Sequence, residues 1–460
     1  MVKFKLKKGL DLRLKGKAEE TVKDIIAPKN ADGSVPQAVE GCVYAVFPAD
    51  FYGFKPRLVV KEGCEVKVGD TLFINKEAEE VKVVSPVSGT VKSIVRGERR
   101  KLLRVEIVAD GKQQGKEYSR LDIDKATAQQ VKDLLLESGL FAFIRQRPFD
   151  IVANPQDTPK GIFISLFSKM PLAQNFAFAV KGREHYLQSG ITALSKIAPV
   201  SVGITPEMVS TPLGHLKNAE AYVFDGPNPS GNAGIQINHI SPINKGETAW
   251  TLGAEEVIFI GKLIEEGKLD LTRVIAVAGS EMKAPAYMRV LTGSPLRLIL
   301  DGNLRQSQHI RIINGNPLTG VPTNIDGNFG AKATEVTVIP EGDDKDELLG
   351  WAMPRLNDYS TSRSYFSWLQ GHKEYDLDAR IKGGERHIIM SGEYDKYLPM
   401  DIYANYLIKA ILTADLDRME ALGIYEVAPE DFAVAEFADS SKLELQRIVR
   451  EGLDMLRKEL

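Results

Sequence analysis

Short runs of alternating hydrophobic and polar residues occupy residues 36–110 and predict a small β domain. Val43, Ala45 and Phe47 alternate with other side chains, and further runs of the same texture follow between turns that contain glycine. Period-two alternation between such turns is typical of strands with one buried face. We therefore expect residues 1–115 to form N-terminal strands and a β domain.

Two half-motifs in this region resemble the halves of a biotinyl/lipoyl domain, a flattened β-barrel. They read EGCEVKVGDTL (62–72) and SPVSGTV (85–91), so the pair spans 62–91. Carrier domains of this family attach their cofactor to a lysine on the hairpin between the halves. Here that hairpin reads NKEAEEV and lacks the carrier pattern. Its lysine, Lys76, does not lie at the expected tip. We interpret the domain as a retained scaffold, with a swinging arm on Lys76 as the alternative.

Residues 116–264 alternate between strand and helix patterns, which predicts a Rossmann-like α/β domain. The expected buried strands are GIFISLF (161–167), a stretch around Val200 and AYVFDG (221–226). The expected helices cover 124–138, closed by Gly139 at a position that favours a left-handed cap, then 182–197 and 248–267.

The remaining chain predicts two further units, giving an α/β multidomain protein. Residues 265–340 hold two apolar runs around a short helix-like segment, which suggests a compact β-grasp module of the SLBB type. Residues 341–460 are expected to be mostly helical. A single buried stripe is predicted there by apolar residues spaced three or four apart: Leu445, Val449, Leu453, Leu456 and Leu460.

Composition and charge narrow the classes of function. The net charge is −3 over 460 residues, which offers no overall field for nucleic acid. Residues 1–17 hold seven Lys or Arg against one Asp, so this arm either favours an anionic surface or is an edge strand guarded by lysines. No apolar stretch approaches the ~20 residues that span a bilayer. The run after Met1 is rich in lysine and has no apolar segment, so we expect no signal peptide. We expect any membrane association to be peripheral.

The sequence lacks the patterns of common catalytic and cofactor sites. Cys42 and Cys64 are the only cysteines, too few for an iron–sulfur cluster, and a disulfide between them is not implied. The six histidines show no metal-ligand spacing, and neither G-x-G-x-x-G nor G-x-S-x-G occurs. The acidic run 341–347 lacks EF-hand spacing and is interpreted as a solvated turn. A large chain without a catalytic pattern is expected to bind a ligand, dock with a partner or gate access to a site.

Two loops of the Rossmann-like domain could line a ligand. The first, SGLFAFIRQRPF (138–149), places aromatic residues where phosphate-binding glycines would be expected. The second, DGPNPSGNAG, contributes Asp225, Gly226 and Gly231 to a rigid turn of close approach. A purely structural turn is the favoured interpretation of the second loop.

The chain resembles, over nearly its whole length, the A subunit family of the Na+-translocating NADH:quinone reductase. The motifs that carry the resemblance, in order, are KGLDL (8–12), SGL (138–140), RQRPF (145–149), VFDGPNPSG (223–231), GWAMP (350–354) and SRS (362–364). The resemblance implies a peripheral subunit on the cytoplasmic face of a bacterial inner membrane, beside the membrane-embedded B subunit. Other subunits of the complex carry NADH oxidation, flavins and sodium movement.

This family is itself similar to the Rnf complex C subunit and to the flavin-binding NADH subunit of respiratory complex I. Those relatives bind FMN on a Gly-rich loop, where this chain has Phe141, Ala142 and Phe143. They bind an iron–sulfur cluster in the helical domain, where this chain has no cysteine after Cys64. We therefore expect neither FMN nor an iron–sulfur cluster.

The altered loop suggests a quinone site. A quinone head needs a flat apolar slot and donors for its carbonyls. Phe141, Phe143 and Phe149 would supply the slot, and Arg145 and Arg147 the donors. The alternative is that the aromatic residues simply fill a vacated flavin cavity. Two other functions stay open, a flavin- and NADH-binding subunit of the complex I type and a pure assembly scaffold.

Overall fold

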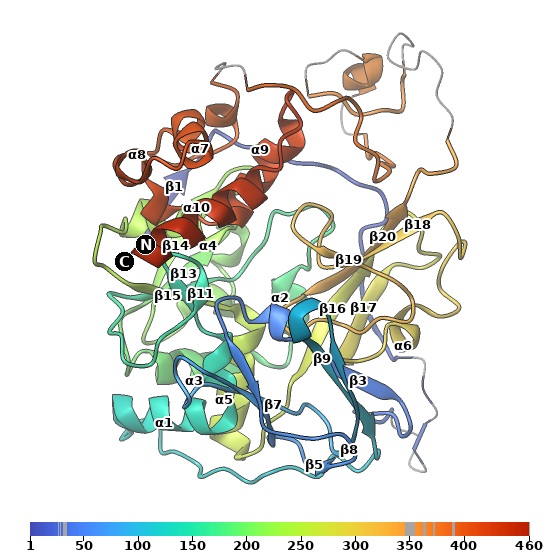
Figure 1. The fold of residues 1–460 in the computed structure, drawn as a ribbon, viewed down its shortest axis with the longest axis vertical. Coiled ribbons are helices and arrows are strands. Elements are labelled where there is room, and N and C mark those ends of the chain that lie inside the picture. Colours follow the sequence, from blue (N-terminus) through green and yellow to red (C-terminus); the bar gives the residue numbers. More distant parts are fainter. Residues whose placement is uncertain are drawn as a thin grey trace.

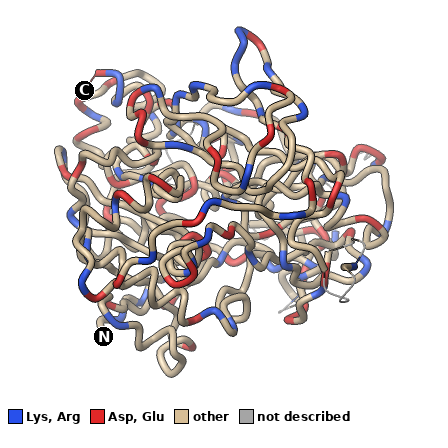
Figure 2. Tube along the Cα trace, turned by 90° about the horizontal axis from the view of Figure 1, so that it is seen from below, with Lys and Arg blue, Asp and Glu red and all other residues tan. Residues whose placement is uncertain are grey.

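The computed structural model describes the chain except for residues 26, 28, 31–34, 346–354, 362–364, 371–372, 389–391 and 460. The GWAMP and SRS motifs and Leu460 therefore lie outside the described residues. The described residues form four β-sheets, with the C-terminal helices and the N-terminal β domain at opposite ends of the molecule (Figure 1). Lys and Arg are interspersed with Asp and Glu along the trace, as Figure 2 shows.

The N-terminal β domain consists of two small sheets, which confirms the strands predicted from alternation. One sheet has the order β3 (Val43–Val46), β9 (Leu102–Ala109), β8 (Gly89–Arg96), β5 (Glu65–Val66). The other has the order β4 (Pro56–Leu58), β6 (Thr71–Asn75), β7 (Lys82–Val84). The two half-motifs bond to each other, because Gly69 N donates to Ser85 O at 3.0 Å and Ser85 N to Asp70 O at 2.8 Å.

A seven-stranded sheet forms the centre of the α/β domain. Its order is β1 (Val2–Lys5), β14 (Glu220–Asp225), β13 (Val200–Ile204), β12 (Ile162–Ser165), β15 (Ala249–Gly253), β10 (Arg145–Arg147), β11 (Ile151–Val152). The strands from β1 to β15 run parallel, and β10 and β11 are antiparallel additions. The three predicted strands of this domain are confirmed, and β1 makes the basic N-terminus an edge strand.

The prediction of one helix over 248–267 is wrong in its first part. Residues Ala249–Gly253 are strand β15, and helix α5 begins only at Ala254 and ends at Glu266. Ala249, Trp250 and Leu252 are all buried, so the strand is covered on both faces. A continuous apolar run of this kind cannot be told from a buried helix by periodicity alone.

The other helices of this domain follow their sequence signals. Helix α1 (Ala128–Ser138) starts with a capping box of Thr127 and Gln130 and ends at Gly139, whose φ of 79° is left-handed. Helix α3 (Glu184–Leu194) packs directly against α5, and α2 (Phe176–Ala179) and α4 (Ala233–Ile240) complete the set. The two helices approach closely because Gly261 of α5 has no side chain. A Cβ at this position would lie 1.7 Å from Tyr186 O of α3.

The third unit is a six-stranded sheet with the short helix α6 (Arg297–Leu300) beside it. Its order is β19 (Val321–Thr323), β18 (Ile310–Asn314), β20 (Glu335–Pro340), β16 (Thr272–Ala278), β17 (Ala286–Leu291), β2 (Glu19–Lys23). The edge strand β2 comes from the N-terminal segment and runs parallel to β17. Sequence reasoning missed β2, because its five residues are all exposed and carry no apolar alternation.

Between 355 and 403 the only helices among the described residues are the short 3-10 helices η7 (Phe366–Gln370) and η8 (Tyr394–Lys396). The C-terminal part is α-helical only from residue 404 onward, so the prediction of mostly helical structure over 341–460 is confirmed for its second half. It contains α7 (Ala404–Leu412), α8 (Leu416–Ala421), α9 (Ala433–Ala438) and α10 (Leu445–Glu459). The predicted stripe of α10 is confirmed at its four described positions, where every leucine and valine is at most 2% exposed. Within the part of the chain that the structure describes, none of the helices combines the length and apolar character needed to cross a bilayer.

Candidate ligand-binding cleft

The seven-stranded sheet has a topological switch point between β12 and β15. The chain runs from β12 to β13 and β14 on one side, then returns to place β15 on the other side of β12. In open α/β sheets, ligands bind outside the carboxyl ends of strands at such a point. A cleft of about 870 Å³ opens there, and the residues that end the two strands, Ser165 and Gly253, line it.

All four parts of the chain contribute to this cleft. The α/β domain forms one wall, and the segment between β18 and β20 forms much of another. Apolar surface comes from Phe47, Met170, Leu252 and Val321. The charged residues that line the cleft are Asp50, Arg104, Arg145, Asp150, Asp326, Lys332, Glu335 and Glu430.

A carboxylate from the C-terminal part occupies the N-terminus of helix α4. A Cβ added at Gly234, the second residue of α4, would lie 2.2 Å from Asp431 Oδ2. Asn232, the N-cap residue, donates from Nδ2 to Asp431 Oδ1 at 3.3 Å and to Glu430 O at 3.0 Å. Helix N-termini attract anions through their free N–H groups and dipole. At α4 the carboxyl group of Asp431 takes that place.

The N-terminus of α5 is filled in the same way. Glu256 is the third residue of α5, and a Cβ added at the N-cap Gly253 would lie 2.0 Å from Glu256 Oε2. The other carboxylate oxygen of Glu256 accepts from Arg273 at 3.1 Å, and Arg273 is fully buried. Both helix N-termini therefore hold internal carboxylates at the edge of the sheet where a phosphate would otherwise bind.

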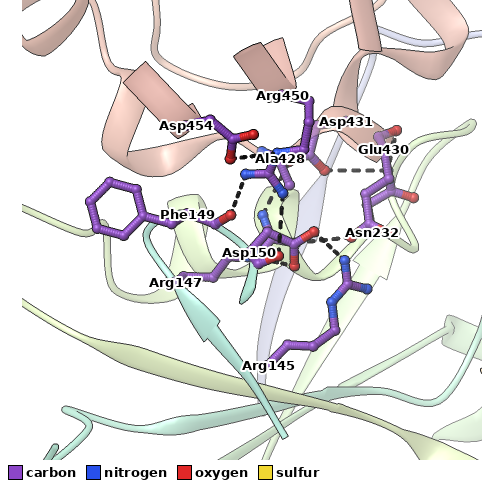
Figure 3. Close-up of polar contacts among 10 residues, drawn as sticks. All are labelled: Arg145, Arg147, Phe149, Asp150, Asn232, Ala428, Glu430, Asp431, Arg450 and Asp454. Carbon is purple, nitrogen blue, oxygen red and sulfur yellow. Dashed lines mark hydrogen bonds and ion pairs between the residues drawn. The ribbon is translucent and has the colours of Figure 1, made fainter. Parts of the chain in front are cut away.

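The RQRPF motif forms a network of buried charges beside the cleft (Figure 3). Arg145 pairs with Asp150, which is itself within 3.5 Å of Arg147. Arg147 is 2% exposed and donates to Glu430 at 2.9 Å. Its ion pair with Asp431 measures 3.7 Å. These contacts tie the end of β10 to the segment that leads into the C-terminal helices.

Helix α10 holds the same loop from the other side. Arg450 donates to the carbonyl of Phe149 and, at 3.3 Å, to the carbonyl of Asp150. Both residues have a positive φ, 77° and 51°, so their backbone conformation is one that side chains disfavour. The guanidinium of Arg450 thus fixes this strained loop through the carbonyls of Phe149 and Asp150.

The environment separates the pKa values of the acids in this network. Burial opposes ionisation of Asp150, but Arg145 and Arg147 outweigh it and hold the pKa of Asp150 well below its usual range. Burial raises the pKa of Asp431 to about 7, against the opposing charge of Arg147. Burial also raises the pKa of Asp50 and of Glu335 on the cleft wall.

Comparison with known proteins places this architecture in a family. The family models that match describe the NqrA N-terminal barrel-sandwich hybrid domain (residues 4–110), the NqrA second alpha/beta domain (126–269) and the NQRA C-terminal domain (274–324). The A subunit of the Na(+)-translocating NADH-quinone reductase of Photorhabdus laumondii is 32% identical over 99% of this chain and 100% of its own. This chain belongs to the NqrA family.

Other relatives agree with that assignment. The corresponding A subunits of Saccharophagus degradans and Pasteurella multocida are each 32% identical over 99% of this chain, with 100% and 99% of their own length covered. Among solved structures, a NAD+-reducing [NiFe]-hydrogenase matches 48% of this chain and 50% of its own at 12% identity, with a TM-score of 0.33. That likeness is too weak to bear on function.

The described NqrA-family motifs converge on neighbouring loops. In KGLDL, Asp11 accepts from Asn228 N at 2.9 Å, and Leu10 N donates to Asn228 O at 2.8 Å. VFDGPNPSG therefore packs on KGLDL at one end. At its other end Gly231 lines the cleft, where a Cβ would lie 2.9 Å from Phe167 O.

The predicted residues of the second loop occupy different places. Asp225 ends β14 and pairs with Lys3 at 3.1 Å, and a Cβ at Gly226 would lie 2.7 Å from Leu6. These two residues hold the N-terminal strand, and neither is among the residues that line the cleft. Of Asp225, Gly226 and Gly231, only Gly231 lines the cleft, where its backbone could approach a ligand.

The five residues predicted to face a quinone do not gather on one surface. Arg145 lines the cleft, and Arg147 is buried in the charge network. Phe141 is fully buried with its ring edge-on to Trp250 at 5.5 Å. Phe143 is 6% exposed and lines an apolar pocket of only about 10 Å³. Phe149 is half-buried against the main core.

Sequence reasoning missed several residues of the cleft. Asp50, Lys332 and Glu335 lie far along the chain from the two candidate loops, and no motif or spacing marks them. The same holds for Glu430 and Asp431, which reach the α/β domain only through the docking of the C-terminal part. Tertiary contact alone brings these residues to the switch point.

The raised pKa of Asp431 predicts a pH dependence of stability. An unfolded aspartate ionises near pH ~4, whereas the folded state keeps the proton on Asp431 up to about pH 7. The folded state binds more protons in that window, so the contribution of Asp431 to the free energy of unfolding is lost as pH rises from ~4 toward 7. Urea unfolding at several pH values measures this effect. Between pH ~4 and 7 the free energy of unfolding should fall less steeply with pH for Asp431→Asn than for the wild type. Equal slopes would contradict the assignment.

Proposed function

We propose that this chain is the peripheral, quinone-associated subunit of a Na+-pumping NADH:quinone reductase. Its likeness to the named A subunits extends over 99% of its length. It would act on the cytoplasmic face of a bacterial inner membrane, beside the membrane-embedded B subunit and the other subunits. The absence of a bilayer-spanning helix among the described residues is consistent with peripheral attachment.

The proposal includes that the chain carries neither FMN nor an iron–sulfur cluster of its own. The observation that supports this most directly is the pair of internal carboxylates, Asp431 at α4 and Glu256 at α5. At α5 a phosphate would meet the carboxylate of Glu256, and like charges at close range repel. At α4 the carboxyl group of Asp431 fills the space that a phosphate would need, whether or not it is ionised. The sequence also has no cysteine beyond Cys64 that could ligate iron in the helical part.

We assign the quinone head group to the cleft at the switch point. Arg145 offers a guanidinium at its wall, and Gly231 gives close access to backbone. In this proposal Phe141 and Phe143 support the wall from the core behind it. Arg147 and Phe149 act by holding the loop that carries Arg145, and Asp225 and Gly226 by holding the loop that carries Gly231.

A calorimetric titration of the purified full-length chain tests this function. A short-tailed quinone is expected to bind saturably near 1:1, while FMN and NADH titrated separately give no binding heat. Binding of FMN would contradict the cofactor-free assignment and favour a flavin-binding subunit of the complex I type.

A pure assembly scaffold is the second candidate function. The burial of Phe141 and Phe143 favours it, since these rings fill the core rather than leave an apolar slot. A scaffold predicts that none of the three ligands binds the isolated chain. The same titration therefore separates the two candidates.

A further inference from the structure

Lys332 lies in the cleft, and its ammonium group has no ion-pair or hydrogen-bond partner among the described residues. It lines the cleft in the segment that leads into β20 and is half-buried. Across the described residues, neither a hydrogen bond nor an ion pair reaches its ammonium group. Its one close contact is with the ring of Phe51, whose centroid lies 5.3 Å away.

The other cations of the cleft are already engaged. Arg104 pairs with Glu106 at 2.7 Å, and Arg145 pairs with Asp150. Asp50 also lines the cleft, but its Oδ2 accepts from Ala331 N at 2.7 Å, and no ion pair joins it to Lys332 within the described residues. Lys332 therefore presents three donors with no acceptor supplied by its own chain.

This unpartnered ammonium costs free energy, which a bound acceptor could recover. A half-buried charge loses hydration, and burial together with Arg145 lowers the pKa of Lys332 to about 8, although Asp150, Glu256 and Asp50 oppose the shift. Because Lys332 is only half-buried and lines the cleft, a ligand bound there could supply the acceptor that the described chain does not.

The backbone on both sides of Lys332 is held rigidly. The guanidinium of Arg273 donates to the carbonyl of Ala331 and, at 3.0 Å, to that of Ala333. Arg273 is fully buried and also pairs with Glu256 of α5. Binding groups are most effective where supporting residues fix their position, and this anchoring gives Lys332 such a position.

We propose that Lys332 is a binding residue of the cleft that donates a hydrogen bond to a carbonyl oxygen of the quinone head group. The inference rests on the proposed function and names a recognition residue for it. A quinone has two carbonyl acceptors and no donor. The cleft offers the free ammonium of Lys332 and those N–H groups of Arg145 that Asp150 does not take, beside the apolar side chains of Phe47 and Leu252.

The test is a quinone titration of full-length variants. Lys332→Met keeps most of the side-chain length and removes the donor, and it is expected to weaken binding of a short-tailed quinone on the order of tenfold or more. Lys332→Arg, which keeps a cationic donor, should retain part of the affinity. Lys67→Met is the matched control, since it removes an exposed ammonium from the N-terminal β domain outside the cleft and should bind as the wild type does.

Thermal melting of the same variants separates binding from folding. Because Lys332 has no hydrogen bond or ion pair to lose and gives up only its contact with the ring of Phe51, Lys332→Met should melt near the temperature of the wild type. If the wild type binds quinone and Lys332→Met binds it equally well, the assignment of Lys332 is overturned and the proposed function stands. If the wild type shows no saturable binding, the proposed function fails, and the assignment fails with it.

Discussion

Replacing Arg147 with alanine is expected to lower the free energy of unfolding by about 3–5 kcal/mol, the range for breaking a buried ion pair by removal of one partner. Arg147 is 2% exposed and lies between Asp150, Glu430 and Asp431. Without its guanidinium, the carboxylate of Asp150 would remain buried with less compensation, and Glu430 and Asp431 would lose the contact that joins them to β10. Because these acids belong to two parts of the chain, the change should also loosen the contact between them.

Urea unfolding of the full-length chain measures this effect. Arg447→Ala is the matched control, because Arg447 pairs with Glu444 and Glu451 on the exposed face of α10 and such surface pairs contribute only ~0–1 kcal/mol. A loss of stability no larger for Arg147→Ala than for Arg447→Ala would show that the buried network does not join the domains as the structure indicates. Limited proteolysis should also cut Arg147→Ala faster near the C-terminal helices.

The second large effect is expected at Phe141. Substitution by alanine should cost about 3–5 kcal/mol, the range for removing a buried aromatic ring, since it leaves a cavity in a packed core. Phe141 is fully buried, and its ring meets the fully buried Trp250 of β15 edge-on. The cavity would lie beside η3 (Leu140–Phe143), at the contact of Phe141 with Trp250 of the central sheet.

The companion variant is Phe149→Ala. Phe149 is half-buried, so the same substitution should cost clearly less there. Equal, small losses for both variants would indicate that Phe141 faces a space open to ligand or solvent rather than the core. Measuring quinone affinity of the folded variants in parallel shows whether Phe141 acts on binding beyond its part in stability.

The contrast between these two rings also shows what a sequence motif can and cannot say. SGLFAFIRQRPF indicated that the phosphate-binding glycines of related flavoproteins are replaced by aromatic residues. It could not indicate which way each ring points. In the structure Phe141 and Phe143 turn into the core, while Arg145, two residues further on, lines the cleft.

The sequence by itself determined the features that depend on local pattern. Alternation predicted the small β sheets, the cap at Gly139 ended α1, and the stripe from Leu445 to Leu456 buried one face of α10. The ordered motifs indicated the family over the whole chain. These features can be predicted because neighbouring residues fix them through periodicity and backbone preference.

Only the tertiary structure decided the composition of the cleft. Asp431 fills the N-terminus of α4 from nearly 200 residues away, as the contact of its carboxylate with Asn232 shows. Strand β15 was mistaken for helix because burial on both faces erases the period that separates the two. Lys332 and Asp50 come to the same cleft from distant parts of the chain. Such sites depend on how whole domains dock. Docking results from many contacts between residues far apart in the sequence, so it produces no local pattern from which the site could be predicted.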